Sequence, residues 1–464
     1  MRPTLRPTSL LVVSLTAALA GALQAQAPAA GADLRIVRGD RVLLDPASGH
    51  VGPATLVIRD GRIDAVLPGA DATVAAKPGD RNLEEFRFSG TDATLLPGLV
   101  DSHVHLTGNP APSFWSATVT TPERATATGV ANALSTVRAG FTTVRDLGAP
   151  DGAGYAVRDA INAGEVPGPR VLSAGRMISI IGGHGDLTGF RPQVIEALDG
   201  GNTCTGPVQC AERVRQLSRA GADVVKFAAT GGVLSQQNRG LDQHFTDEEM
   251  QAIVSTAHQL GLKVAAHAHG PRGIEAAARA GVDSIEHGTY VDEAGIKAMK
   301  ASGTTLVPTL SPTIAYRENL PKGLYTKVVE AKIRIRLEAT GKNIAAARRA
   351  GLPIAFGTDA GVSEHGRNAE EMPLMVQYGG MSPQDVLLSA TQGAAKLLGL
   401  ENEIGTLAPG YSADLIVVRG DPLADVSALQ RDRVQFVMVR GEDVPMAANG
   451  SAPRADGLVV VSAR

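Results

Sequence analysis

The sequence predicts an α/β protein in which a TIM-type (β/α)8 barrel carries a small β-sandwich domain built from both chain ends. The first observation is a repeated unit in the middle of the chain. An alanine-rich helix ends in a glycine, and a short apolar strand then ends in a polar residue. Glycine after a helix is the usual left-handed cap, and an apolar run suits a strand buried on both faces. The second observation is that both ends of the chain alternate apolar and polar residues between turn signals, as antiparallel strands do.

The N-terminus has the pattern of a secretory signal peptide over residues 1–27. Arg2 and Arg6 give a basic start, residues 9–23 are apolar, and the Ala-Gln-Ala run at 25–27 offers small residues for cleavage. The apolar stretch is shorter than a membrane span. We therefore expect an exported protein, periplasmic or secreted, with no membrane contact after cleavage.

The two ends of the mature chain are expected to form one β-sandwich domain, from residues 28–94 and residues 403–464. Turn signals such as the Arg-Asp-Gly-Arg run at 59–62 separate the alternating segments, which favours antiparallel pairing. The expected strands lie at 34–37, 42–44, 55–66, 412–418 and 434–439.

Residues 95–402 are expected to form the barrel. One helix shows the logic: Thr246 and Glu249 match a capping box, apolar residues follow at helical spacing, and Gly261 ends the helix. A doubly wound open sheet is the alternative, but no Gly-x-Gly-x-x-Gly follows an early strand. The eight strands are expected around 95–105 and 170–174 and at the ends of the units 138–146, 219–226, 261–267, 279–287, 303–308 and 349–359.

Ionisable residues end several of these strands, and a TIM barrel gathers its functional groups at the carboxyl ends of the strands. His103 and His105 are separated by one residue and therefore point the same way from the first strand. Six ionisable groups at one mouth would repel one another or stay unsatisfied. A bound cation resolves this conflict better than an inert barrel with paired histidines does. The six residues are His103, His105, Lys226, His267, His287 and Asp359.

Four motifs accompany these residues. They are Val-Lys with Thr-Gly-Gly within 225–232, His-Ala-His-Gly at 267–270, Ile-Glu-His-Gly-Thr at 285–289 and Gly-Thr-Asp-Ala at 357–360. With them the chain resembles the amidohydrolase superfamily of metal-dependent hydrolases, from the lead-in at 96–101 to the segment at 407–415. Within the superfamily it is most similar to the branch of Xaa-Pro dipeptidases and ochratoxin-degrading amidases.

The resemblance implies a centre of two divalent metal ions, with zinc as the expected metal. Lys226, carboxylated to N6-carboxylysine, would bridge both ions, because a protonated lysine would repel them. A plain cation or a snorkelling side chain at Lys226 is the alternative. The other implied ligands are His103, His105 and Asp359 for one ion and His267 and His287 for the other.

Three further histidines are candidates for substrate contacts or weaker roles. His267 and His269 share a face, so either could be the ligand; the superfamily pattern favours His267 and leaves His269 to touch substrate. By the same resemblance His184, in a glycine-rich loop after the third strand, polarises the scissile carbonyl, although an ordinary loop histidine would have the same pattern. The weaker candidates are His244, His365 and His258, the last on a helix surface.

The implied reaction is amide hydrolysis that releases a C-terminal amino acid from a dipeptide or an N-acyl amino acid. Ochratoxin A, cut to ochratoxin alpha and phenylalanine, belongs to this class. A hydroxide bridging the metals would attack, and Asp359 would pass its proton to the leaving amine. A mononuclear deaminase or cyclic-amide hydrolase similar to imidazolonepropionase is one alternative, and a non-catalytic binding barrel is another. Gly270, where mononuclear relatives carry Glu, and the complete ligand set favour the binuclear enzyme.

Composition limits the partners. The formal charge of -3 and the aromatic content of 3% disfavour nucleic acid, so a small-molecule amide or short peptide is expected, with a homo-oligomer implied by the resemblance. Specificity is expected in the loops 179–201 and 234–245, where Arg239 or His244 could bind a substrate carboxylate.

The chain has two cysteines, Cys204 and Cys210. In an oxidising compartment they could close a small disulfide loop, and the alternative is two free thiols. Without nearby histidines they make a poor zinc site.

Overall fold

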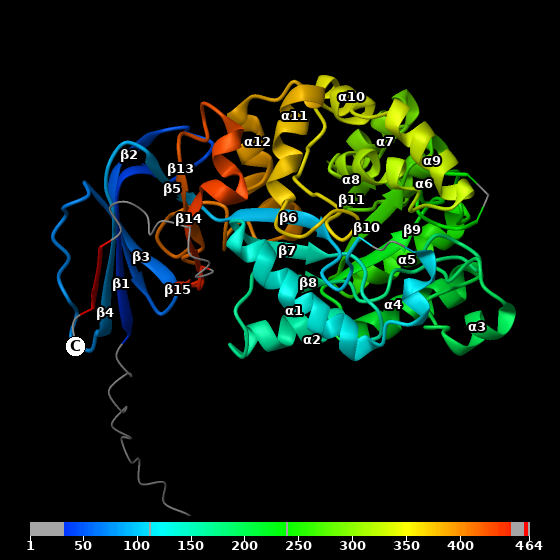
Figure 1. The fold of residues 1–464 in the computed structure, drawn as a ribbon, viewed down its shortest axis with the longest axis horizontal. Helices are drawn as coiled ribbons and strands as arrows, with labels where there is room; N and C mark the ends of the chain where they lie inside the picture. The colour runs from blue at the N-terminus through cyan, green and yellow to red at the C-terminus, as the bar shows by residue number, and fades with distance from the viewer. Residues whose placement is uncertain (1–31, 111–112, 238–239, 447–458, 463–464) are drawn as a thin grey trace, which may run out of the picture.

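The computed structural model describes residues 32–110, 113–237, 240–446 and 459–462. The predicted signal peptide and Arg239 lie outside these ranges. Figure 1 shows a β-sheet, built from blue and red strands, beside a larger part in which helices surround parallel strands. In the described part of the chain, no helix is both long and apolar enough to cross a membrane.

Both chain ends contribute to one nine-stranded sheet, in which β13 pairs with β5 and thereby joins the two ends. The β2–β3 hairpin is antiparallel, as expected, but β1 pairs in parallel with β4 and β5. The prediction of a purely antiparallel domain is therefore wrong, because the chain crosses over between these strands instead of turning back tightly. The strands are β1 (Asp33–Leu43), β2 (Val51–Arg59), β3 (Arg62–Pro68), β4 (Arg81–Phe88), β5 (Ala93–Pro97), β13 (Leu415–Arg419), β14 (Val434–Val439), β15 (Glu442–Asp443) and β16 (Val459–Ser462).

The larger part is TIM-barrel-like, with two parallel sheets in the orders β6-β7-β8 and β12-β11-β10-β9. Residues 353–360 run between β12 and β6: Leu306 N–H donates to Pro353 O at 2.9 Å, and Ser102 N–H donates to Phe356 O at 2.9 Å. This segment takes the place of the eighth expected strand, although isolated bridges rather than a regular strand hold it. The strands are β6 (Leu99–Val104), β7 (Phe141–Asp146), β8 (Arg170–Ser173), β9 (Val224–Ala228), β10 (Lys263–Ala268), β11 (Ser284–His287) and β12 (Thr305–Val307).

Helices flank these parallel strands (Figure 1). The capping box of α5 is present as expected, because Thr246 and Glu249 each accept a hydrogen bond from the other's backbone N–H. The α-helices are α1 (Pro122–Arg138), α2 (Ala153–Asn162), α3 (Pro192–Ala197), α4 (Gly206–Ala220), α5 (Asp247–Gln259), α6 (Pro271–Ala280), α7 (Glu293–Ser302), α8 (Pro312–Asn319), α9 (Lys327–Glu338), α10 (Lys342–Ala350), α11 (Glu371–Gly379), α12 (Pro383–Ser389) and α13 (Gln392–Leu398).

The single strand expected around 95–105 is two strands, and Gly98 separates them. β5 belongs to the terminal sheet and β6 to the barrel-like part. Gly98 N–H donates to Asp414 O at 2.9 Å, and a Cβ added at Gly98 would lie 2.1 Å from Thr142 Oγ1. The close approach of two backbones therefore requires glycine here. This junction fixes the start of β6, whose far end carries His103.

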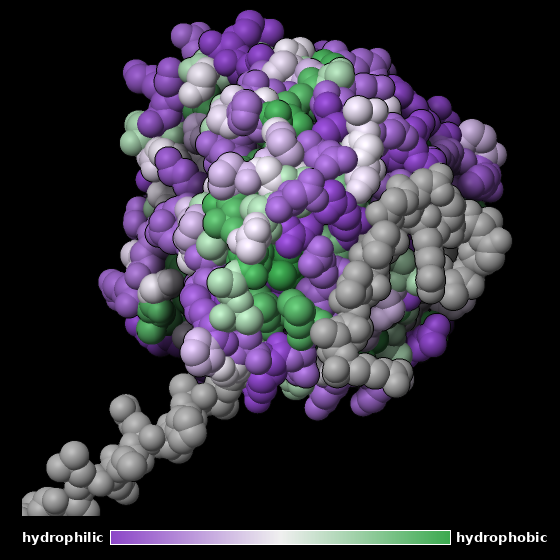
Figure 2. All heavy atoms as spheres, turned by 90° about the vertical axis from the view of Figure 1, so that its left-hand side faces the viewer, coloured by the Kyte–Doolittle hydropathy of each residue, from purple (hydrophilic) through white to green (hydrophobic). Residues whose placement is uncertain are grey.

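One hydrophobic cluster spans the two parts of the molecule. Leu96 of β5 and Ile416 of β13 pack in the same buried cluster as Phe141 and Met372. On the outer side of the terminal sheet, apolar side chains gather near the middle of a mainly hydrophilic face (Figure 2). The shared cluster ties the terminal sheet to the strands that carry the site.

Candidate metal centre

The expected site residues meet in one cavity of about 310 Å³ at the carboxyl ends of the parallel strands. All six expected metal ligands line it, together with His184 and His269. They come from the ends of β6, β9, β10 and β11, from Asp359 at the end of the bridging segment, and from the loops that follow β8 and β10. The strand-end positions predicted from the sequence therefore converge.

The first cluster consists of His103, His105 and Asp359, whose potential ligand atoms all lie within 4.8 Å of one another. His105 Nε2 is 3.3 Å and His103 Nε2 is 3.5 Å from Asp359 Oδ1. The opposite nitrogens are bonded elsewhere: His105 Nδ1–H donates to Gly148 O at 3.1 Å, and His103 Nδ1 lies 2.7 Å from Glu286 Oε2. Such outer partners fix the tautomer and leave Nε2 of each ring free to bind a metal.

The charges of this cluster suit a cation. Burial, and then the charge of Lys226, lower the pKa of His103 to about 4, so its ring is neutral at physiological pH. Burial alone would raise the pKa of Asp359, but contact with His105 and nearby positive charge hold it at about 2. Burial alone would lower the pKa of His105, but the Asp359 carboxylate raises it. Neutral imidazoles and an ionised carboxylate are the forms that bind zinc.

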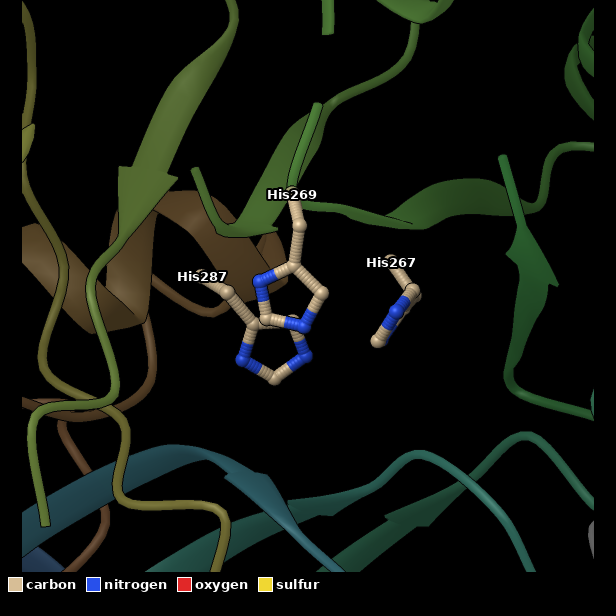
Figure 3. Close-up of side chains that lie close together, drawn as sticks. All are labelled: His267, His269 and His287. Carbon is tan, nitrogen blue, oxygen red and sulfur yellow. The ribbon is translucent and has the colours of Figure 1, made fainter. Parts of the chain in front are cut away.

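The second cluster consists of His267, His269 and His287 (Figure 3), again with potential ligand atoms within 4.8 Å. The rings of His269 and His287 stack at 4.8 Å, and His267 lies edge-on to His287 at 4.6 Å. His267 Nε2–H donates to Gly231 O at 3.2 Å; because a carbonyl only accepts, Nδ1 of that ring keeps its lone pair. Burial lowers the pKa of all three rings well below the usual value.

Lys226 lies at the end of β9, is 1% exposed, and places Nζ 3.4 Å from His103 Nε2. Its charge lowers the pKa of His103 in one cluster and of His267 and His287 in the other. Within the described ranges no carboxylate lies within ion-pair distance of Nζ. Burial lowers the pKa of Lys226 to about 8, so its neutral amine is accessible near neutral pH.

Beneath the first cluster lies a buried ion pair that sequence reasoning missed. Arg145 Nη2 is 2.9 Å from Glu286 Oε1, and both side chains are at most 2% exposed. Burial would raise the pKa of Glu286, but the charge of Arg145 and the hydrogen bond from His103 hold it at about 2. The sequence signal was a positive residue, Arg145, in the buried strand β7 and a negative residue, Glu286, in the buried strand β11. Buried charges are almost always paired, so the two could have been expected to meet.

Three residues at the mouth have a strained backbone conformation. His287, Thr309 and Asp359 have φ angles of +71°, +44° and +60°, which non-glycine residues rarely adopt. His287 is held by Nδ1 to Thr309 Oγ1 at 2.6 Å, and Asp359 N–H donates to His103 O at 2.7 Å. Strained residues of this kind cluster at functional sites, where the surroundings enforce the geometry.

His184 reaches the cavity from its loop, with its ring 4.2 Å from that of His267. Its Nδ1 lies 2.5 Å from Ser235 Oγ. A Cβ at Gly232 would lie 2.1 Å from His184 Nδ1, so the glycine pair of the Thr-Gly-Gly motif admits this ring. Burial, and then the charge of Lys226, lower the pKa of His184 to about 3.

The weaker candidates lie apart from the centre. His258 is on the surface of α5, as expected, 3.0 Å from Asp283 Oδ2. His365 is buried and lies 3.1 Å from His105 O, so it supports the first cluster from behind. His244 is half-buried and is not part of the cavity lining within the described residues. Cys204 and Cys210 form a disulfide.

Helices α8 and α9 supply lining residues that sequence reasoning also missed, among them Tyr316 and Arg336. The buried stripe of α9 is Val329, Lys332, Ile333 and Arg336. Two cations on the apolar face of a helix were the sequence signal, because such faces normally carry only apolar residues.

The donor set fits two divalent ions. Each cluster offers three ligand atoms, burial keeps the rings of His103, His267 and His287 neutral, and outer hydrogen bonds orient several of the ligands. Imidazole nitrogen with carboxylate oxygen is a combination that suits zinc and similar metals. A carbamate at Lys226 would supply oxygen ligands between the clusters.

Comparison with known proteins agrees with this chemistry. The sequence model of the amidohydrolase family matches residues 94–444. Ochratoxinase of Aspergillus niger is 32% identical over 408 residues, which cover 84% of this chain and 82% of that protein. A Xaa-Pro dipeptidase crystallised with methionine in its active site superposes with a TM-score of 0.79 at 33% identity, over 89% of this chain and 99% of that one. The crystal structure of A. niger ochratoxinase gives a TM-score of 0.77 at 29% identity, over 91% and 99% of the two chains.

Proposed function

The chain belongs to the amidohydrolase family and is a hydrolase of amide or peptide bonds, and from this premise we propose that it uses two metal ions to release a C-terminal amino acid from a small peptide or N-acyl amino acid. The observation that carries the proposal is the pair of three-ligand clusters that line one cavity together with Lys226. A deaminase or a non-catalytic barrel would not need a buried lysine beside them.

In this proposal His103, His105 and Asp359 hold one ion and His267 and His287 hold the other, with carboxylated Lys226 as the bridge. We assign the fifth-strand ligand to His267 because its hydrogen bond to Gly231 O directs an Nδ1 lone pair into the site. Bound zinc ions supply a Lewis acid and hydroxide near neutral pH.

The chain's own residues handle the protons. Asp359 is ionised at neutral pH, so it can accept the proton of the attacking water and deliver it to the leaving amine nitrogen. When the Ser235 hydroxyl donates a hydrogen bond to His184 Nδ1, the neutral ring carries its proton on Nε2. This Nε2–H can then donate a hydrogen bond to the scissile carbonyl oxygen. His184 thereby stabilises the negative charge that develops there.

The relatives and the cavity support the substrate class. The dipeptidase binds an amino acid, methionine, in its active site, and ochratoxinase is named for its action on ochratoxin. The inner cavity shares Leu234, Gly361 and Val362 with an outer pocket of about 670 Å³. The outer pocket is large enough for a bulky acyl group, so both ochratoxin-like amides and dipeptides fit the proposal.

The wider organisation is also proposed. We infer that residues 1–27 direct export to the periplasm or the medium, which the disulfide supports. We infer that the two parallel sheets close through residues 353–360 into one eight-stranded barrel, that the terminal sheet forms a β-sandwich domain, and that the protein is a homo-oligomer.

The proposal is tested by metal analysis together with a hydrolysis panel. The purified protein is expected to contain two zinc ions per chain and to release the free amino acid from Xaa-Pro dipeptides, N-acyl amino acids or ochratoxin A. Chelation should abolish turnover, and added zinc should restore it. Absence of turnover on every amide by the two-zinc protein would overturn the proposal.

A further inference from the structure

Arg336 is a buried cation without a counter-ion. It lies on α9 and lines the inner cavity, and it is 4% exposed. Its Nη1 has no hydrogen-bond partner, and no carboxylate of the described residues lies within ion-pair distance of its guanidinium. Burial lowers its pKa, but a guanidinium stays charged in proteins. A buried charge of this kind is energetically costly unless a group of opposite charge pairs with it.

Its neighbour on the same helix face does not share this property. Lys332, one turn earlier, donates to Gly232 O at 2.8 Å and to Ser235 O at 2.6 Å. These bonds fix the loop that carries the Ser235 partner of His184. Lys332 therefore has a structural role, whereas the guanidinium of Arg336 is available to bind a ligand that enters the cavity.

The residues around Arg336 indicate which chemical group it can bind. The guanidinium lines the inner cavity together with His269 and the metal-ligand candidates. Tyr316 of α8 lines the same cavity, is 4% exposed, and stays protonated because burial raises its pKa. A planar guanidinium with a phenol donor matches a carboxylate, which accepts paired hydrogen bonds from arginine.

We propose that Arg336 binds the α-carboxylate of the amino acid that becomes the leaving group. This rests on the proposed function, and it makes the enzyme specific for amides that end in a free carboxylate. The α-carboxylate is two bonds from the scissile nitrogen, so it enters the inner cavity together with the reacting amide. Residues 234–245, where the sequence suggested a carboxylate contact, are not needed for this role.

The test compares two substrates that differ only at this group, N-benzoyl-L-phenylalanine and N-benzoyl-L-phenylalaninamide, with release of benzoate as the readout. The wild-type protein should hydrolyse the acid with a kcat/KM roughly 100-fold above that of the amide. Arg336→Met should lower kcat/KM for the acid by a similar factor and leave the amide nearly unchanged. Arg336→Lys should recover part of the preference, because it keeps the charge but loses the paired geometry.

A binding measurement separates recognition from turnover. Calorimetric titration with L-phenylalanine and with L-phenylalaninamide should show preference for the acid in the wild type and none in Arg336→Met. Arg334→Met, an exposed arginine on the same helix, is the matched control and should behave as wild type. Equal losses on both substrates, or an unchanged preference in Arg336→Met, would overturn the inference. Failure of the wild type on both substrates would instead count against the proposed function.

Discussion

At the scale of single residues, the protonation states of the buried side chains decide whether the site can bind metal ions. Burial keeps the rings of His103, His267 and His287 neutral, while Asp359 and Glu286 remain ionised because positive charge lies next to them. Lys226 is the exception, since it brings positive charge to the place where cations are expected to bind. Conversion of its amine to a carbamate reverses that charge and adds two oxygen ligands, so this one side chain decides whether the clusters act together.

Replacement of Lys226 by alanine should therefore separate the clusters. We expect the zinc content to fall from two ions per chain to one or fewer, and kcat/KM to fall by at least about 100-fold. Metal analysis and activity measured on the same preparation check both. Lys263→Ala, a partly exposed lysine on the neighbouring strand, is the control and should keep both ions. Two retained ions in Lys226→Ala would remove the bridge from the proposal.

Replacement of Glu286 by glutamine should weaken the fold in a pH-dependent way. The pKa of this carboxyl falls from 4.5 to about 2 on folding, so its contribution is present above pH 4.5 and is lost as the pH falls toward 2. That shift corresponds to on the order of 3 kcal/mol. In metal-free protein the variant should be less stable than wild type at pH 6, and the difference should shrink at pH 3.

Denaturant unfolding at both pH values measures this difference. Glu442→Gln removes the exposed carboxylate that pairs with Arg35 and should show little effect, as surface ion pairs contribute little. A deficit in Glu286→Gln that is the same at both pH values would contradict the assigned ionisation.

At the scale of elements, the strand ends determine the site and the helices complete it. The strand-end residues could be predicted because parallel strands place their carboxyl ends at one mouth. Arg336 and Tyr316 could not, because their positions depend on how α8 and α9 fold over the cavity. The role of Glu286 was missed because it directly precedes His287, a proposed ligand, and becomes clear only once β7 places Arg145 beside it.

The junction between β5 and β6 offers a test at this scale. Gly98→Ala would place a methyl group 2.1 Å from Thr142 Oγ1 and 2.8 Å from Thr142 Cβ, so β6 or β7 must shift. We expect a loss of roughly 1–3 kcal/mol in unfolding free energy, typical of overpacking, with weaker metal binding because β6 carries His103. Gly52→Ala on β2 is the control, since its nearest neighbour is the mobile end of His50 at 3.3 Å. Equal effects of the two substitutions would contradict the proposed constraint.

At the scale of the whole molecule, the sequence predicted one β-domain built from both chain ends, and in the structure β13 lies beside β5 in one sheet. The parallel pairing of β1 with β4 and β5 could not be foreseen, because side chains alternate between the two faces in parallel and antiparallel strands alike. The split at Gly98 was missed for a related reason: an apolar run does not show where a chain passes from one sheet to another.

Because β13 lies between β5 and β14, the C-terminal segment should be essential to the whole fold. A chain ending at Gly410 loses Leu415, Ile416, Val417 and Val418, all fully buried, and their burial contributes roughly 1.5–3 kcal/mol each. The sum is comparable to the entire stability of a typical domain, about 5–15 kcal/mol. We therefore expect the truncated chain to lack cooperative thermal unfolding and to bind no zinc. Removal of residues 447–464 is the control, because the strand it deletes from the described sheet, β16, pairs with β4 alone; that chain should unfold cooperatively and keep its metal. If the chain ending at Gly410 unfolded cooperatively and bound zinc, the terminal sheet would be an independent attachment, and the shared hydrophobic cluster would have no part in forming the site.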